Sequence, residues 1–316
     1  MANDLDKLQR QVGQLGQFFY GKRRVDWRDQ HFTPEKAYVC AVLANVAYLE
    51  LTDYELTHHK YVKLIPSLCY REVVARGINI DLRQFLSQAE FRDVFVIPTE
   101  HLIVVGMVQN DVIFIALRGT RFFALSDWLI DLHSRSVPTY VNGIPGAFHS
   151  GFYLHITQCI EQIADAVSKR QSSPPMPVYV VGHSLGGAMA AILHALDNTH
   201  FASYYRGGSE ISVNINTTCS YTYGMPRYGN EPMVYQLRSP YCLINENDVV
   251  PTVPPKWLDY ADAPDRWRLS DNGTLVPASH KIPWLLSAAK RLYLLRGLSR
   301  HRIENYVKFL AKTVGV

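Results

Sequence analysis

The amino-acid sequence predicts an α/β fold, in which a mostly parallel central sheet carries helices on both faces. The composition is that of a globular protein, because 47% of the 316 residues are hydrophobic and 19% are charged. From about residue 92 onward, short β-branched runs alternate with helix-like segments, which is the pattern of a covered parallel sheet. A hairpin turn at Gln109–Asp111 between two such runs predicts that one edge of the sheet is antiparallel.

The N-terminal part is expected to be mainly helical. After Pro34, apolar residues recur every three or four positions as far as Leu49, which predicts a helix. Residues 54–91 predict further helices and loops. No linker divides the chain, so we expect a single domain over residues 1–316, with residues 1–90 packed on the sheet as its helical part.

The remaining elements follow from the same periodicities. Two long segments predict helices, at 149–170 and 186–196, and a Ser/Pro-rich stretch at 171–177 separates the first of them from a buried strand. The predicted strands cover residues 92–98, 101–108, 111–117, 178–182, 211–224 and 241–245.

Charge and cysteine usage exclude several classes of protein. The net charge of +4 is too small to indicate a nucleic-acid-binding protein. The five cysteines are scattered without a Cys-x-x-Cys pair, so we expect neither a disulfide framework nor a metal site. The N-terminus lacks the pattern of a secretory signal, and no apolar run approaches the roughly 20 residues that span a bilayer. These features predict a cytoplasmic protein, with a trimmed leader or another route of secretion left open.

The strongest chemical signal is the segment Gly182–Gly187, which reads Gly-His-Ser-Leu-Gly-Gly. It lies between a predicted strand and a helix of small residues, the setting of a nucleophile elbow. Such a turn is so tight that flanking side chains would collide, which explains the glycines at 182 and 186. Ser184 is therefore the candidate nucleophile, held above the sheet near a helix N-terminus whose N–H groups favour a developing oxyanion.

A nucleophilic serine needs a base and an acid that orients the base. In proteins whose serine lies on a nucleophile elbow of this kind, the residues follow one another in the chain as serine, acid, histidine. Asp248 follows the strand 241–245 and is the first choice for the acid; Glu246 is the local competitor, and Asp262, Asp265 and Asp271 are weaker. Two histidines follow, His280 and His301, and position along the chain favours His301 only slightly.

An oxyanion hole requires two backbone N–H donors. The amide of Leu185, directly after the nucleophile, is the first candidate. The second should follow an earlier strand, and the strand 111–117 runs into Arg118, Gly119 and Thr120. Thr120 can present its N–H while Gly119 permits the turn.

Taken together, these motifs resemble the class 3 lipases, the fungal-type triacylglycerol lipases of the α/β-hydrolase superfamily. The similarity runs from about residue 95 to the C-terminus and rests on six segments in the family's order: Ala116–Thr120, Asp127–Leu132, Phe148–Phe152, Gly182–Gly187, Tyr223–Asn230 and Asn247–Pro251. Since the chain lacks the leader and disulfide pattern of secreted fungal members, it looks more like an intracellular or bacterial branch.

The resemblance implies Ser184, Asp248 and His301 as a triad, with His301 placed ahead of Tyr306 as the family's histidine precedes a tyrosine. It implies the amides of Thr120 and Leu185 as the oxyanion hole, and no cofactor. It also implies a lid over residues 121–130, whose large apolar side chains are Phe122, Phe123, Leu125 and Trp128.

The activity implied is hydrolysis of lipid esters through an acyl-enzyme, as in a triacylglycerol lipase, at a transient lipid–water interface. A phospholipase or a mono- and diacylglycerol hydrolase is the alternative within the same chemistry. A non-catalytic hydrolase-fold binding module is the alternative from another class, although such modules usually lose a triad member and here every candidate is present.

Overall fold

A central sheet of eight strands organises the protein, in a computed structural model that describes residues 2–49, 82–99, 101–118, 136–203, 207–246, 248–278 and 300–316. The order across the sheet is β1-β2-β3-β6-β9-β10-β11-β12. The strands are β1 (Arg92–Pro98), β2 (Ile103–Gln109), β3 (Val112–Arg118), β6 (Val178–His183), β9 (Thr217–Tyr223), β10 (Tyr241–Asn245), β11 (Arg266–Leu269) and β12 (Leu275–Pro277).

Five neighbouring strands, β3, β6, β9, β10 and β11, are parallel, whereas the pairs β1–β2, β2–β3 and β11–β12 are antiparallel. The turn between β2 and β3 has Asn110 and Asp111 at positive φ, as a tight two-residue hairpin requires. The predicted α/β-hydrolase fold, with a mostly parallel sheet and antiparallel N-terminal strands, is therefore confirmed.

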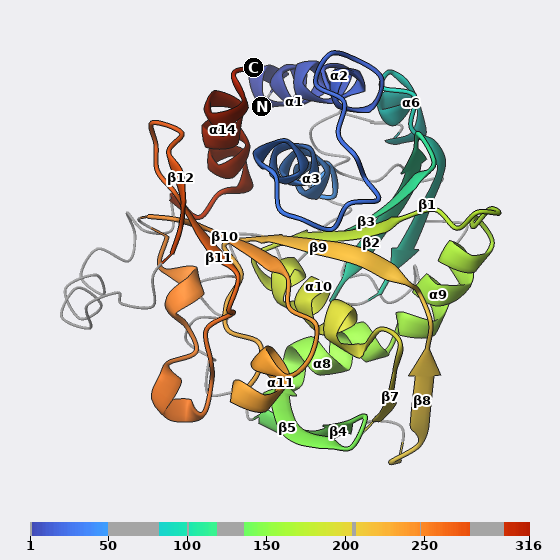
Figure 1. The fold of residues 1–316 in the computed structure, drawn as a ribbon, viewed down its shortest axis with the longest axis vertical. Helices are drawn as coiled ribbons and strands as arrows, with labels where there is room; N and C mark the ends of the chain where they lie inside the picture. Colours follow the sequence, from blue (N-terminus) through green and yellow to red (C-terminus); the bar gives the residue numbers. More distant parts are fainter. Residues whose placement is uncertain are drawn as a thin grey trace.

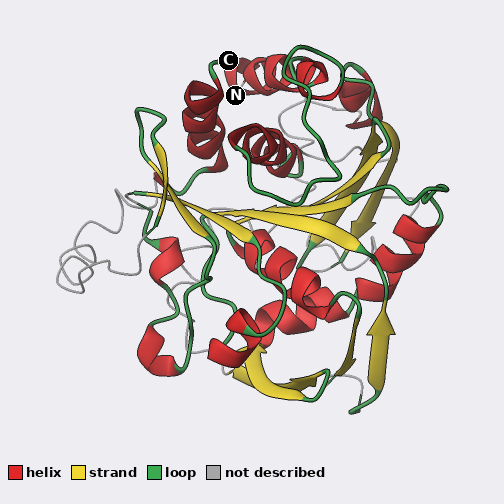
Figure 2. Cartoon of the chain, viewed as in Figure 1, coloured by secondary structure: helices red, strands yellow, loops and turns green. Residues whose placement is uncertain are grey.

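Helices cover both faces of the sheet (Figures 1 and 2). One layer contains the N-terminal helices and the last helix of the chain: α1 (Ala2–Gly13), α2 (Gly16–Phe19), α3 (Pro34–Val46), α6 (Leu82–Ser87) and α14 (Ile303–Val314). The opposite layer contains α8 (Ser150–Thr157), α9 (Ile160–Ser168), α10 (Leu185–Leu196) and α11 (Glu231–Tyr235). Helix α3 is buried on all sides because it lies between the sheet, α1 and α14.

A second sheet, which the sequence did not predict, lies beyond the α8–α10 layer at the bottom of Figure 1. Its order is β5-β4-β7-β8. The strands are β4 (Ser136–Val141), β5 (Ile144–His149), β7 (Thr199–Ala202) and β8 (Glu210–Val213). They are short, and β4 carries Pro138; of the four, only β8 overlaps a predicted strand, at 211–224.

Two predicted elements are each divided in the structure. The helix expected at 149–170 is two helices, α8 and α9, because Cys159 leaves the helical conformation at φ −121° and ψ 2°. The strand expected at 211–224 is β8 and β9, separated at Asn216, which has φ 56°. The buried carboxylate of Asp197 accepts the N–H groups of Ile215 and Thr217 there, so these groups do not continue a ladder.

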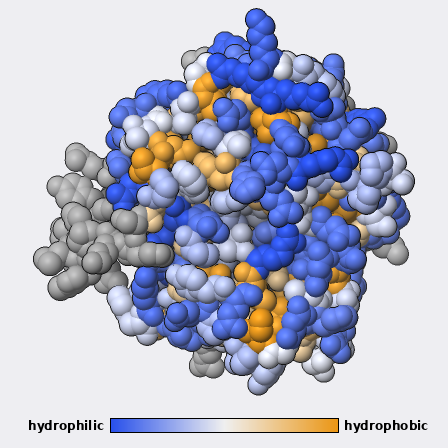
Figure 3. All heavy atoms as spheres, viewed as in Figure 1, coloured by the Kyte–Doolittle hydropathy of each residue, from blue (hydrophilic) through white to orange (hydrophobic). Residues whose placement is uncertain are grey.

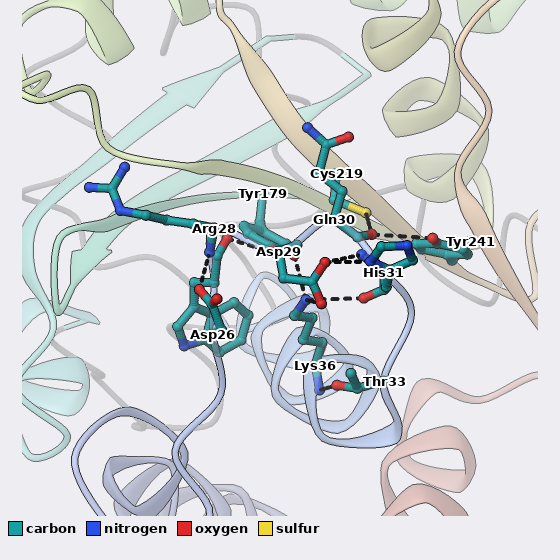
Figure 4. A network of polar contacts seen from close by, with 11 residues as sticks. Asp26, Arg28, Asp29, Gln30, His31, Thr33, Lys36, Tyr179, Cys219 and Tyr241 are labelled. Carbon is teal, nitrogen blue, oxygen red and sulfur yellow. Dashed lines mark hydrogen bonds and ion pairs between the residues drawn. The ribbon is translucent and has the colours of Figure 1, made fainter.

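The segment ahead of α3 is tied to the sheet by a network of polar contacts (Figure 4). Tyr179 of β6 donates its hydroxyl to the carbonyls of Trp27 and Asp29, and Tyr241 of β10 donates to that of Gln30. Lys36 is almost completely buried, and its ammonium group is satisfied by the carbonyls of Asp29 and His31. The network therefore fixes where α3 begins relative to the sheet.

The four cysteines in the described ranges, Cys40, Cys159, Cys219 and Cys242, are free and buried. Burial raises the pKa of the thiols of Cys159, Cys219 and Cys242 to about 12, so they are small apolar side chains rather than reactive groups. Within the described part of the chain, no helix is both long and apolar enough to cross a bilayer.

Candidate active site

Ser184 stands at the sharp bend between β6 and α10. Its backbone has φ 58° and ψ −130°, a conformation that L-residues rarely adopt. A Cβ on Gly182 would lie 2.3 Å from the carbonyl oxygen of Gly186, so only glycine fits on the approaching strand. The N–H of Ser184 donates to the carbonyl of Tyr223 at 3.0 Å, which fastens the bend to β9. This is the geometry of a nucleophile elbow.

The helix that follows supplies the first oxyanion candidate. Leu185 is the first residue of α10, so its N–H has no carbonyl acceptor within the helix. Ser184 and Leu185 are both buried. The second candidate, Thr120, and the predicted lid residues Phe122, Phe123, Leu125 and Trp128 lie outside the described residues, as does the rest of the segment 119–135.

Asp248 and His301 are 53 residues apart in the chain but form a direct pair. His301 Nδ1 lies 2.8 Å from Asp248 Oδ2, and the N–H of Val250 donates to Asp248 Oδ1 at 2.9 Å. Both side chains are buried. Asp248 lies three residues beyond the carboxyl end of β10, and His301 lies in the segment just before α14.

The other candidate acids have different surroundings. Glu246 is exposed, Asp262 is paired with Arg227, Lys256 and Arg266, and Asp271 is paired with Arg300. Asp265 is exposed, although partial loss of solvent around its carboxyl group raises its pKa. The alternative histidine, His280, lies outside the described residues.

Tyr306 makes a further hydrogen bond to Asp248. Its hydroxyl donates to Asp248 Oδ2 at 2.6 Å and accepts the N–H of Asn245 at 3.0 Å. Burial, followed by the charge of Asp248, raises the pKa of Tyr306 well above its usual value, so the hydroxyl keeps its proton and remains a donor. The sequence analysis placed Tyr306 only as the tyrosine that follows His301. Its contact with Asp248 is visible only in the tertiary structure.

This arrangement determines how His301 can act. Because Nδ1 faces a carboxylate, it carries a proton, and Nε2 is left with its lone pair. That Nε2 is buried and has no hydrogen-bond partner among the described residues. The imidazole also lies close to the elbow, since its ring centroid is 4.5 Å from that of His183, the neighbour of Ser184. The structure thus brings an oriented histidine near a strained serine, as nucleophilic catalysis requires, but Nε2 makes no hydrogen bond to Ser184.

Nothing in the described ranges groups three or more His, Cys, Asp or Glu side chains in a way that could hold a metal ion. The order of the strands in the sheet, the elbow at Ser184, and an acid and a histidine that follow it in the chain are the features of the α/β-hydrolase fold.

Comparison with known proteins shows which proteins with this fold the chain is similar to. Residues 114–257 match the family described as lipase (class 3). A secreted mono- and diacylglycerol lipase of Malassezia globosa is 28% identical over 193 residues, which cover 56% of this chain and 59% of the relative. A lipase of Rhizomucor miehei is 27% identical over 234 residues, which cover 70% of this chain and 60% of the relative. Residues 114–257 of this chain are therefore similar to the class 3 lipase family.

The match therefore spans about 60% of the length of these relatives. Among solved structures, the native Rhizomucor miehei lipase propeptide complex is 22% identical, with a TM-score of 0.49 over 78% of this chain and 71% of that one.

Proposed function

We propose that this chain is a serine hydrolase that cleaves carboxylic esters of lipids, in the manner of a triacylglycerol lipase. The single observation that carries the proposal is the buried Asp248–His301 pair. The ring of His301 contacts that of His183, the residue before Ser184, and Ser184 has a positive φ. The family relationship supports the same chemistry.

In the proposed mechanism, Nε2 of His301 takes the proton of Ser184 as the serine oxygen attacks the ester carbonyl carbon. Asp248 holds the imidazole in the correct tautomer and stabilises the imidazolium. The N–H of Leu185, with that of Thr120 as second donor, receives the developing oxyanion. The imidazolium then gives its proton to the departing alcohol, and a water molecule repeats the sequence on the acyl-enzyme, restoring the free serine.

Contact with a lipid–water interface is part of the proposal. The face drawn in Figure 3 is mainly hydrophilic, with apolar residues in small separate patches. The turn η4 (Lys256–Leu258), eight residues beyond Asp248, carries Trp257, which is 77% exposed, next to the exposed Leu258. Tryptophan favours the boundary between water and lipid, so this turn is a candidate point of contact.

The test of the chemistry is Ser184→Ala, assayed on a soluble p-nitrophenyl ester and with a fluorophosphonate probe. We expect loss of turnover by at least about 10³-fold and loss of labelling. Ser220→Ala is the matched control, because Ser220 is buried and its hydroxyl has no partner among the described residues. Near-normal hydrolysis by Ser184→Ala would refute the proposal, and an unlabelled wild-type protein would favour a non-catalytic binding module.

The substrate class needs a separate measurement. Emulsified triacylglycerol, diacylglycerol, monoacylglycerol and phosphatidylcholine, offered to the wild-type protein at equal interfacial area, rank the candidates directly. We expect glycerol esters to be cleaved faster than the phospholipid. Faster cleavage of phosphatidylcholine would replace the proposed substrate class by that of a phospholipase.

A further inference from the structure

His183, the residue before Ser184, makes contacts that the triad does not require. Its side chain is buried, and its Nε2 lies 2.6 Å from the backbone carbonyl oxygen of His301. Its Nδ1 lies 2.9 Å from the hydroxyl of Tyr48, which comes from the turn after α3. The two imidazole rings are tilted by 32° with centroids 4.5 Å apart. One side chain thus touches both the elbow and the segment that carries His301.

The protonation of His183 follows from its two partners. A carbonyl oxygen can only accept a hydrogen bond, so Nε2 of His183 must carry the proton that is shared with His301. Nδ1 is then a lone pair, and the hydroxyl of Tyr48 donates to it. The two hydrogen bonds therefore run in one direction: Tyr48 donates to His183, and His183 donates to the carbonyl of His301.

A second imidazole this close to His301 is useful only if it stays neutral. Burial, followed by the nearby His301, holds the pKa of His183 well below its usual value. Burial also raises the pKa of the Tyr48 hydroxyl, which keeps its proton. His183 therefore does not compete for the proton that His301 has to accept.

Resting on the proposed ester hydrolysis, we propose that His183 and Tyr48 are positioning residues that set the place of His301 relative to Ser184 by holding its backbone carbonyl. Asp248 fixes one end of the imidazole through Nδ1, whereas His183 fixes the main chain from which the ring projects. Two attachments are needed because one hydrogen bond leaves the ring free to swing about that contact.

The same contacts reach the strand that precedes the second oxyanion candidate. Arg118, the last residue of β3, is paired in register with His183, and its guanidinium lies 5.8 Å from the centre of the Tyr48 ring. Tyr48 thus lies where the end of β3, the elbow and the His301 segment meet, so we expect a change at Tyr48 to reach the site although it lies outside the six lipase-like motifs.

The experiment compares three variants of the full chain. Tyr48→Phe removes only the hydroxyl, His183→Met removes the donor while filling the space, and His183→Gln keeps an N–H donor. With a soluble ester, we expect kcat to fall about tenfold in Tyr48→Phe and about 100-fold in His183→Met, with KM within about twofold of the wild type. His183→Gln should recover a large part of the loss.

A second measurement does not depend on turnover. The proton NMR signal of the His301 Nδ1–H, identified by its loss in His301→Gln, should shift or broaden in Tyr48→Phe while Asp248 is unchanged. Wild-type kcat and an unmoved signal in folded Tyr48→Phe and His183→Met would overturn the positioning role. His183→Gln as slow as His183→Met would overturn it too, leaving only packing. An inert wild-type protein would instead overturn the proposed function.

Discussion

Gly224 lies against the carboxylate of Asp248 so closely that a Cβ there would be 2.6 Å from Oδ2. The same added atom would lie 2.9 Å from His301 Nδ1 and 2.9 Å from the hydroxyl of Tyr306. Gly224 also has φ 56°, and its N–H donates to the carbonyl of Leu243 at 3.0 Å. The glycine at the end of β9 is therefore the surface on which the acid, the histidine and the tyrosine pack.

Gly224→Ala should separate Asp248 from His301. The methyl group must displace at least one of three buried polar atoms, and the positive φ adds strain, so we expect a loss of about 1–3 kcal/mol in the free energy of unfolding. Ester hydrolysis should fall at least about 100-fold, because a misplaced base is costly. Gly143→Ala is the control: it has φ 78° but open space around it, so its activity should stay at the wild-type level. Equal activity of the two variants would contradict the prediction.

Tyr306→Phe tests the third bond to the acid. The change deletes a donor to Asp248 Oδ2 and leaves the buried N–H of Asn245 without its acceptor. We expect urea denaturation to show a loss of about 1–3 kcal/mol, and kcat to fall about tenfold. Tyr221→Phe provides the comparison, since its buried hydroxyl has no partner among the described residues and its removal should cost almost nothing. Similar losses of stability and kcat in both variants would mean that the hydrogen bond from Tyr306 to Asp248 does not cause them.

Asp262, which is buried, pairs with two largely buried arginines and the exposed Lys256 next to the loop that follows Asp248. Its carboxylate lies 2.7 Å from Arg227 Nε, 2.7 Å from Lys256 Nζ and 3.1 Å from Arg266. Arg227 also donates to the carbonyls of Thr252 and Pro254. Asp262→Asn leaves buried cations without their counter-charge, so we expect a loss of about 3–5 kcal/mol in the free energy of unfolding.

Asp165→Asn is the surface control, because its pair with Lys169 is exposed and should contribute less than about 1 kcal/mol. A comparably small effect at Asp262 would contradict the expectation.

The contribution of Asp262 should also depend on pH. Burial by itself raises the pKa of this carboxyl group, but Arg227, Lys256 and Arg266 together hold it below its ordinary value. A carboxylate with a lowered folded-state pKa stabilises the protein above its unfolded pKa of about 3.9, and this is lost as the pH falls further. The difference in unfolding free energy between wild type and Asp262→Asn should stay constant from pH 6 to 8 and shrink below about pH 4. A constant difference down to pH 3 would contradict the conclusion that the pH dependence comes from the Asp262 carboxyl group.

Trp257→Ser tests the proposed contact with lipid. The side chain is largely exposed, so folding stability should hardly change, whereas partition onto phosphatidylcholine vesicles should weaken about tenfold. Tyr140→Ser is the control, because Tyr140 is 62% exposed but belongs to the second sheet. Hydrolysis of a soluble ester should be unchanged in both. Equal partition of the two variants would place the lipid contact elsewhere.

The strand–helix alternation, the antiparallel β2–β3 hairpin and the elbow at Ser184 could be predicted because each depends on neighbouring residues. The divided elements could not, since the break before β9 depends on Asp197, which comes from the end of α10. The second sheet was missed for a related reason: its strands are too short to carry a period of their own and depend on pairing across the chain.

At the site, chain order alone limited the histidine to two candidates, whereas the 2.8 Å contact between His301 and Asp248 appears only in the folded chain. The localisation predicted from the N-terminus remains a prediction. Local sequence determined the bend that raises Ser184, because steric exclusion at Gly182 acts between residues a few positions apart. Tertiary structure decided the roles of Gly224, Tyr306 and His183, because each acts on an atom brought to it from a distant part of the chain by the packing of α3 and α14 on the sheet.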